Sequence, residues 1–507
     1  MKVTKIALAC GLAVAAMSAH AAGPTIPAGA KTVFVAGASA PDSFLADIAS
    51  SMLAGTAAGA GTSVGARTSD SNYRAFVGYS KVAGQVGSPI VFIKRSAGGS
   101  VWGVDPVARA QRVVTIDLNN CTANAGADAA TYAWICGTKG IDPGVAGADT
   151  AANNGLVPDV GVSDVEPALF QTPFNTENGQ PALSAAEVAR LSNKPVNLAM
   201  FGIVATDAVP ATYHLSRSAY GAMLSGAAQD WSLVDAADFD PVVVCRRVNG
   251  SGTQTSYNWF FSGFPCNKAS NGYASAKPAA ATDSFGYLGG AGTAVSPIII
   301  DPTAGYTVVE NSSSGDVRNC LKAAQAGTNF TVTGSFGKVY KVMFANVNGP
   351  SKAIGVLSLD SYTKAGAGFG YTFRQLDGAG VFDGVSQTVT AGPGTGISPS
   401  KQNLLDGKYD FALELSMQAR NVAVTNAQGD VVAPISTDAV KNTFYTAFVK
   451  NAGSTKYTGN DGGSFTTVPN AFATLPSVDS YSTKPSFVTK YSRDGNTCQP
   501  LVAKPSL

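Results

Sequence analysis

The sequence predicts an α/β protein, in which short strands alternate with helices along the chain. Runs of β-branched residues, among them KTVFVAG (31–37) and DPVVVCRRV (240–248), are each followed by a stretch with helix-like character. The sequence has neither a repeat of fixed period nor a heptad pattern, and loops rich in Gly, Ala and Asn separate the units, notably at 122–155. This alternation is typical of an α/β sheet rather than of an all-β repeat.

Four strand-to-helix transitions share one form, a strand that ends in a turn of small polar residues. In the first, 31–53, the strand ends at Gly37-Ala38-Ser39-Ala40 and a helix begins at Pro41, which suits the first helical turn. The other three are 89–111 with Ser96-Ala97-Gly98-Gly99, 157–170 with Ser163-Asp164, and 240–261 with Gly250-Ser251-Gly252-Thr253. Ser, Thr and Gly are ordinary helix caps, so each turn alone indicates only that a helix begins there.

Together, the four turns indicate more than any one of them does alone. In an open α/β sheet the carboxyl ends of strands meet a crevice, and the first N–H groups of the helices that follow have no partner within the helix. The helix dipole makes these ends positive, glycine allows a ligand to come close, and hydroxyls add donors. Converging turns of this kind predict an anion site that needs no metal.

The chain is sparsely charged, with 13% charged residues against about 25% in a typical domain. Residues 1–21 have the pattern of a secretory signal, with Lys2 and Lys5 ahead of an apolar run and Ala19-His20-Ala21 at the cleavage site. Loss of both lysines would take the 35 basic residues to 33, equal to the 33 acidic ones. This balance argues against a nucleic-acid partner, no later run is long enough to span a membrane, and we expect a periplasmic or secreted protein.

Histidine and cysteine usage narrows the chemistry. His214 would be the single histidine of the exported chain, which rules out a multi-histidine metal site, and no cofactor is predicted. Six cysteines follow the signal, an even number that favours structural disulfides in an exported chain. Six cysteines allow 15 connectivities. Pairing of sequence neighbours gives Cys121–Cys136, Cys245–Cys266 and, by remainder, Cys320–Cys498.

The order of the four turns resembles that of the periplasmic phosphate-binding proteins of ABC uptake systems, members of the type II periplasmic binding protein class. That family has a G-A-[ST] turn, then Ser-Gly-Gly, then G-x-S-D, then R-x-x-G-S-G-T. The matching residues here are Gly37-Ala38-Ser39, Ser96-Ala97-Gly98-Gly99, Gly161-Val162-Ser163-Asp164 and Arg247-Val248-Asn249-Gly250-Ser251-Gly252-Thr253. The resemblance is discontinuous and runs from about residue 32 to beyond 415.

The resemblance implies a fold of two α/β lobes with a hinge and a central ligand cleft. We place one lobe at 22–204 and 412–507 and the other at 205–411, after a signal peptide at 1–21. The segment 195–207 would be the first crossover between the lobes, and 407–417 would be the return. In this arrangement the converging turns would line the cleft.

The resemblance also implies a role for each site residue. Arg247 would grip two oxygens of an oxyanion as a fork, and hydroxyls would come from Ser39, Ser96, Ser251 and Thr253. Backbone N–H groups would come from Ala40, Gly252 and Thr253. Asp164 would accept the proton that phosphate carries at neutral pH and sulfate lacks, so it would reject sulfate.

The two adjacent arginines are expected to differ. Paired arginines at a strand end usually lie on a solvated edge, and the period of two turns Arg246 to the opposite face from Arg247. We therefore expect replacement of Arg247 to abolish binding and replacement of Arg246 to leave it almost unchanged.

Departures from the family leave the ligand open. Ala40 stands where the family often has phenylalanine, and an extra stretch between Ser96 and Asp164 carries Cys121 and Cys136. The expected function is a non-enzymatic solute-binding protein for inorganic phosphate or a related protonated oxyanion, with an ABC permease as partner. The alternative is an exported structural or adhesive protein that keeps the scaffold without transport. A phosphatase using Ser251 or Asp164 is a weaker hypothesis, since the sequence has no metal-ligand cluster and a single histidine after the signal.

Overall fold

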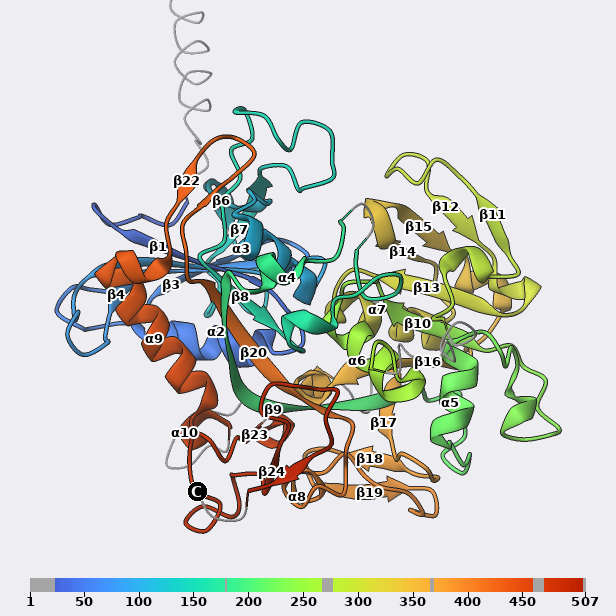
Figure 1. Ribbon diagram of the computed structural model, residues 1–507. Helices are drawn as coiled ribbons and strands as arrows, with labels where there is room; N and C mark the ends of the chain where they lie inside the picture. The colour runs from blue at the N-terminus through green and yellow to red at the C-terminus, as the bar shows by residue number, and fades with distance from the viewer. Residues whose placement is uncertain (1–22, 178–179, 267–276, 365–368, 459–468, 505–507) are drawn as a thin grey trace, which may run out of the picture.

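The computed structural model describes residues 23–177, 180–266, 277–364, 369–458 and 469–504, so the expected signal peptide lies outside the described residues. Its strands form two groups that Figure 1 shows side by side, one drawn mainly in blue and the other in yellow and green. Within the described ranges, no helix is both long and apolar enough to cross a membrane.

The first lobe is built around β1 (Lys31–Gly37). This strand lies between β5 (Pro89–Arg95) and β8 (Val160–Ser163) and is parallel to both. Beyond them, β4 (Tyr73–Ser80) pairs antiparallel with β5, and β20 (Ala412–Arg420) pairs antiparallel with β8. The sheet is extended by β2 (Leu53–Ala54), β3 (Val64–Arg67), β6 (Thr115–Ala123), β7 (Trp134–Lys139) and β23 (Phe472–Thr474).

The second lobe repeats this plan around β10 (Val243–Arg247). This strand lies parallel between β13 (Thr307–Asn311) and β16 (Ala353–Ser358). Further strands of this sheet are β17 (Tyr371–Arg374), β18 (Val381–Asp383) and β19 (Thr388–Ala391). A small four-stranded sheet contains β11 (Tyr287–Gly289), β12 (Ile298–Ile300), β14 (Phe330–Thr333) and β15 (Val339–Val342). Two further pairs of short strands are β21 (Val424–Thr425) with β22 (Val431–Val432), and β24 (Tyr491–Ser492) with β25 (Val502–Ala503).

One long strand, β9 (Leu191–Thr206), joins the two lobes. Its first part, up to Met200, pairs with β20, and its last part, from Phe201, pairs with β16 and β17. Figure 1 shows it passing from one strand group to the other. From Val196 onward the strand is buried, because sheet or helix covers it on both sides. The predicted two-lobed α/β architecture is confirmed.

Helices follow the central strands as the turns predict. α2 (Asp42–Ser51) follows β1 and buries Phe44 and Ile48, α6 (Gly252–Ser262) follows β10, and α7 (Ser314–Ala326) follows β13. The longest, α9 (Ala439–Gly453), packs on the first lobe with Phe444 and Phe448. The remaining α-helices are α3 (Asp105–Arg109), α4 (Ala185–Val188), α5 (Arg217–Leu224), α8 (Lys401–Leu405) and α10 (Thr455–Thr458).

The segment 122–155, expected as surface loop, is partly sheet. β6 and β7 form an antiparallel hairpin in which Cys121 faces Cys136, and these two residues form a disulfide as predicted. The same segment carries Asp142, which forms a bidentate pair with Arg95 at the end of β5 (2.5 and 2.9 Å). The extra stretch therefore belongs to the first lobe and neutralises a buried arginine there.

The other two predicted disulfides are wrong. The structure joins Cys245 to Cys320 and Cys266 to Cys498. Cys245 lies on β10 and faces α7, which covers that sheet and carries Cys320. Cys266 follows α6, and eleven helical residues advance the chain by about 16 Å, so sequence neighbours are carried apart.

The Cys245–Cys320 bond should stabilise the fold more than Cys121–Cys136. It closes a loop of 75 residues against 15, for which chain entropy gives about 4.5 and about 3 kcal/mol. We expect the paired variant Cys245→Ala/Cys320→Ala to lose more unfolding free energy than Cys121→Ala/Cys136→Ala in urea titrations. A non-reducing peptide map that joins Cys245 to Cys266 would contradict the assignment.

Candidate functional site

The site forms where the carboxyl ends of the two central strands meet. In the first lobe β1 lies between β5 and β8, which follow it along the chain, and in the second lobe β10 lies between β13 and β16 in the same way. The connections to these two neighbours therefore run in opposite directions across the sheet and leave a crevice at the end of the central strand. The turn after β1 brings Ser39 to the second lobe, where its Oγ accepts from Arg247 Nη1 (2.9 Å) and lies 3.1 Å from Ser314 Oγ. The Val101 N–H of the first lobe donates to the Gly250 carbonyl of the second (2.9 Å).

Arg247 is buried, with 2% of its surface exposed. Its Nε donates to the Asn311 carbonyl (3.3 Å), its Nη2 to the Ser312 carbonyl (2.7 Å), and its Nη1 to the hydroxyls of Ser39 and Ser314. All of these acceptors are neutral. Because burial penalises the charged form more than nearby carboxylates favour it, the pKa of Arg247 falls to about 10. The guanidinium is therefore a buried positive charge whose hydrogen bonds go to neutral oxygens.

Asp164 is the carboxylate that acts most strongly on the charge of Arg247. It follows β8, its N–H donates to Ser100 Oγ (3.1 Å), and its Oδ2 accepts from Thr253 Oγ1 across the lobes (3.3 Å). Its Oδ1 is buried and has no hydrogen-bond partner in the described part of the chain. Burial raises its pKa to about 6, although Arg247 acts in the other direction. Asp164 is thus an acceptor with one oxygen unused.

Two glycines let the lobes approach this closely. A Cβ at Gly252, the first residue of α6, would lie 2.7 Å from Asp164 Cβ and 2.2 Å from Ser100 Oγ. A Cβ at Gly99 would lie 2.8 Å from Arg247 Nη2, and its φ of 87° is left-handed. Larger side chains at either position would push the strand ends apart.

The predicted site residues differ in what the structure has them bond to. Ser39 and Thr253 lie in the crevice and bond to Arg247 and Asp164. Ser251 is the N-cap of α6 and accepts from the Gln254 N–H (3.4 Å), which is the ordinary capping role. Ala40 is buried, and its carbonyl accepts from Ser358 Oγ (3.0 Å).

Ser96 is engaged differently from the role that the resemblance implies. Its Oγ donates to Asp42 Oδ1 (2.6 Å) and accepts from Lys94 Nζ (2.9 Å). Lys94 is buried and also donates to the carbonyls of Gly37 and Ala38, so its ammonium group stabilises the turn after β1. The sequence gives little warning of such a lysine, because a charged residue in an apolar strand usually points to solvent.

Sequence reasoning missed the turn after β13. Ser312 and Ser314 contact Arg247 directly, and Ser313 caps α7 by accepting from the Asp316 N–H (3.1 Å). The run ENSSSGD (310–316) has the same strand–turn–helix form as the four turns that were recognised. A search for that form alone would have found it.

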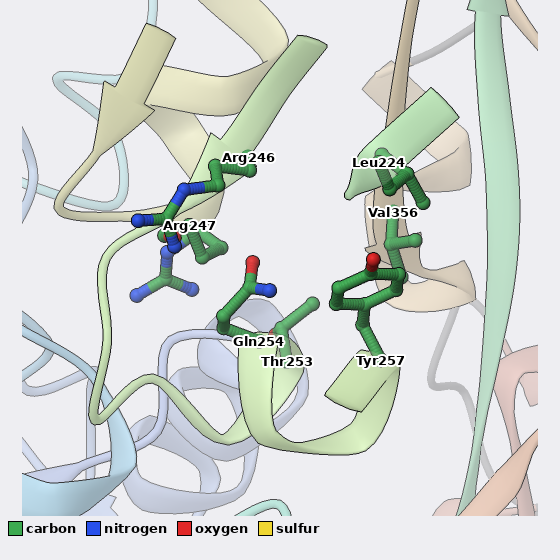
Figure 2. Close-up of a pocket in the computed structure, with 7 residues that line it drawn as sticks. All are labelled: Leu224, Arg246, Arg247, Thr253, Gln254, Tyr257 and Val356. Atoms are coloured by element: carbon green, nitrogen blue, oxygen red, sulfur yellow. The ribbon is translucent and has the colours of Figure 1, made fainter. Parts of the chain in front are cut away.

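The expectation that Arg246 lies on a solvated edge is wrong, because Arg246 is buried. Arg246 is 5% exposed and its Nη2 pairs with Glu310 Oε1 at 2.5 Å, while Nη1 donates to the Arg247 carbonyl and to Asn249. Glu310 lies beside Arg246 on β13, so the neighbouring strand provides the counter-charge. Figure 2 shows both arginines at a small pocket between β10 and α6, whose other lining residues are Leu224, Thr253, Gln254, Tyr257 and Val356.

Metal chemistry has no evident centre in the part of the chain that the structure covers. Among those residues, no group of three or more His, Cys, Asp or Glu side chains is arranged to hold a metal ion. The site consists of one guanidinium, hydroxyls, helix N-termini and one carboxyl group.

Comparisons with known proteins give structural likeness at low identity. No protein-family model and no curated protein sequence matches the chain. It is similar to a Clostridium perfringens protein assigned as a phosphate ABC transporter substrate-binding protein with bound phosphate (10% identity, TM-score 0.40, 85% of this chain and 97% of that chain). It is also similar to a human phosphate-binding apolipoprotein (13%, 0.38, 87% and 90%) and to an ABC-type phosphate transport receptor from Vibrio cholerae (13%, 0.29, 59% and 77%).

The buried ion pair of Arg246 should matter for stability. Arg246→Ala leaves Glu310 charged and buried without its partner, which costs about 3 to 5 kcal/mol of unfolding free energy. The double variant Arg246→Met/Glu310→Met removes both charges, and we expect it to recover most of that loss in urea titrations. Equal stability of Arg246→Ala and the native protein would show that the pair does not form.

Proposed function

We propose that the protein is an exported, non-enzymatic solute-binding protein that captures inorganic phosphate or a related protonated oxyanion between its lobes. The observation that carries this proposal is the buried guanidinium of Arg247, whose hydrogen bonds within the described residues go to neutral oxygens. An oxyanion would supply the missing counter-charge. The N-termini of α2, α6 and α7 and the hydroxyls of Ser39 and Ser314 would add donors.

Asp164 supports a ligand that brings its own proton. A buried carboxylate repels an anion, and the desolvated repulsion costs several kcal/mol unless a hydrogen lies between the two. The unused Oδ1 of Asp164 can accept that hydrogen from phosphate at neutral pH. Sulfate has no hydrogen to donate, so this residue would select against it.

The proposal includes a division of the chain and a place of action. Lobe 1 would comprise 22–204 and 412–507 and lobe 2 would comprise 205–411, hinged where β9 and the segment before β20 cross between them. After removal of a signal peptide at 1–21, the protein would work in the periplasm or outside the cell. It would pass its ligand to an ABC permease.

Replacement of Arg247 tests the charge that carries the proposal. We expect the native protein to bind phosphate and arsenate saturably in isothermal titration calorimetry, and Arg247→Ala to lose measurable binding because its fork makes the charged bonds. Arg112→Ala is a matched control, since Arg112 pairs with Asp430 outside the site.

The outcomes separate the candidate functions. Absence of heat with phosphate, arsenate and phosphonates would reject the oxyanion ligand. If such a protein also assembled with rising concentration irrespective of ligand, the structural or adhesive alternative would be favoured. Turnover of a chromogenic phosphate ester would contradict the non-enzymatic assignment.

Asp164 makes sulfate binding depend on pH. Above its pKa of about 6 the carboxylate repels sulfate, whereas below that value the neutral carboxyl can donate to it. We expect the sulfate affinity of the native protein to rise as the pH falls from 8 to 5. Asp164→Asn should bind sulfate at both pH values, and equal exclusion by the two proteins would remove the proton-acceptor role.

The same residue gives a ligand-free control on stability. Its pKa is about 6 when folded and 3.8 as the ordinary value, so the folded state binds more protons between these values. Stability from this group is full below about pH 4 and is lost as the pH rises through 6. Asp164→Asn should therefore be more stable than the native protein at pH 8, by about 2 to 3 kcal/mol, and not at pH 4.

A further inference from the structure

A second polar pocket adjoins the candidate site. It has a cavity volume of about 40 Å³ and opens to solvent, and it is lined by the first turns of α2 and α7, by β4 and the turn before it, and by the segment after β16. Most of its lining is polar. Neither the sequence motifs nor the proposed phosphate site accounts for it.

Ser39 connects this pocket with the candidate site. Its hydroxyl bonds to Arg247 and Ser314, and the same residue lines the pocket together with Ala40. Ala40 ends in a single methyl group, at the position where the phosphate-binding family that this turn resembles often has phenylalanine. A small residue here leaves space beside the oxyanion position.

Most charged groups around the pocket have hydrogen-bond or ion-pair partners. Asp42 lies 3.3 Å from Lys94 and 3.4 Å from Arg74, and it also accepts from Ser96. Asp70 accepts from Thr68 and twice from Asn72. Arg318 donates to Ser361 Oγ (3.3 Å).

Asp360 differs from Asp42 and Asp70 in having, among the described residues, one buried oxygen without a hydrogen-bond partner. It is 4% exposed, and its Oδ2 accepts from the Ser43 N–H at the start of α2 (3.3 Å). Its Oδ1 is buried and has no hydrogen-bond partner in the described ranges. Burial, followed by repulsion from Asp42 and Asp47, raises its pKa to about 7, although the charge of Arg318, which lines the same pocket, acts in the other direction. A positive group placed beside it would relieve both penalties.

We infer that the pocket takes a short amine-bearing substituent of the bound oxyanion, so that the ligand class includes aminoalkyl phosphate monoesters and phosphonates in their singly protonated form, which keeps a hydrogen for Asp164. Arg247 and the surrounding donors would hold the phosphoryl oxygens, and the substituent would pass Ala40 to place its ammonium at Asp360. This inference rests on the proposed function, because it uses the same oxyanion position.

Calorimetry with four ligands tests the inference on the native protein. The probes are inorganic phosphate, phosphoethanolamine, ethyl phosphate, which lacks the amine, and phosphoglycolate, which carries a negative substituent. With affinities expressed per singly protonated ligand, we expect phosphoethanolamine to bind about tenfold or more tightly than ethyl phosphate, because a charged hydrogen bond forms only with the amine. Phosphoglycolate should bind more weakly than either.

Asp360→Asn assigns the preference to one residue. We expect this variant to bind inorganic phosphate like the native protein and to bind the two esters within about threefold of each other. If it does not fold, phosphoethanolamine with an acetylated amine replaces it, and loss of the amine charge should remove the same preference. If the acetylated compound, a neutral amide, kept the preference over ethyl phosphate, the role of Asp360 would be overturned.

Failure of the inference and failure of the proposed function give different results. Phosphate binding with the esters excluded, or with no preference for the amine, overturns the pocket as a substituent site and leaves the phosphate proposal standing. Tighter binding of phosphoglycolate than of phosphoethanolamine also overturns it. If none of the four ligands binds, the oxyanion site itself is rejected and the inference falls with it.

Discussion

The hydrogen bond from Arg247 to Ser39 joins the two lobes at the ends of their central strands, and much of the surrounding structure serves it. β9 runs through both sheets and fixes how the lobes face each other. The Cys245–Cys320 bond ties the strand that carries Arg247 to α7, whose first turn supplies Ser314. A buried arginine costs free energy, so this framework holds a group that would otherwise turn toward water.

The site keeps two charged groups in states that folding alone disfavours. Burial lowers the pKa of Arg247 and raises that of Asp164, so each ionised group reduces stability at neutral pH. Arg246, one residue away, shows the opposite solution, because Glu310 neutralises it within the same sheet. The contrast between adjacent arginines separates a structural ion pair from a buried charge whose hydrogen-bond acceptors within the described residues are all neutral.

The sequence predicts the general plan of the fold because strand, turn and helix are local features. It also places Ser39, Asp164, Arg247 and Thr253 at strand ends that the structure brings together. It fails where a contact depends on packing between distant elements. The partner of Cys245 is set by which helix covers β10, and the task of Ser96 is set by Lys94 beneath the turn. Neither can be worked out from spacing along the chain.

The balance of charge at the crevice bears on both proposals. One guanidinium, Arg247, is influenced by the carboxylates of Asp164, Asp316, Asp42 and Glu177. A fully deprotonated anion would be attracted by Arg247, by Lys94 and by the helix N-termini, and repelled by several carboxylates. A ligand that brings a proton reduces the repulsion at Asp164, and one that also brings an ammonium would reduce it at Asp360, in the adjoining pocket. The carboxylates near Arg247 thus favour anions that carry hydrogen-bond donors of their own.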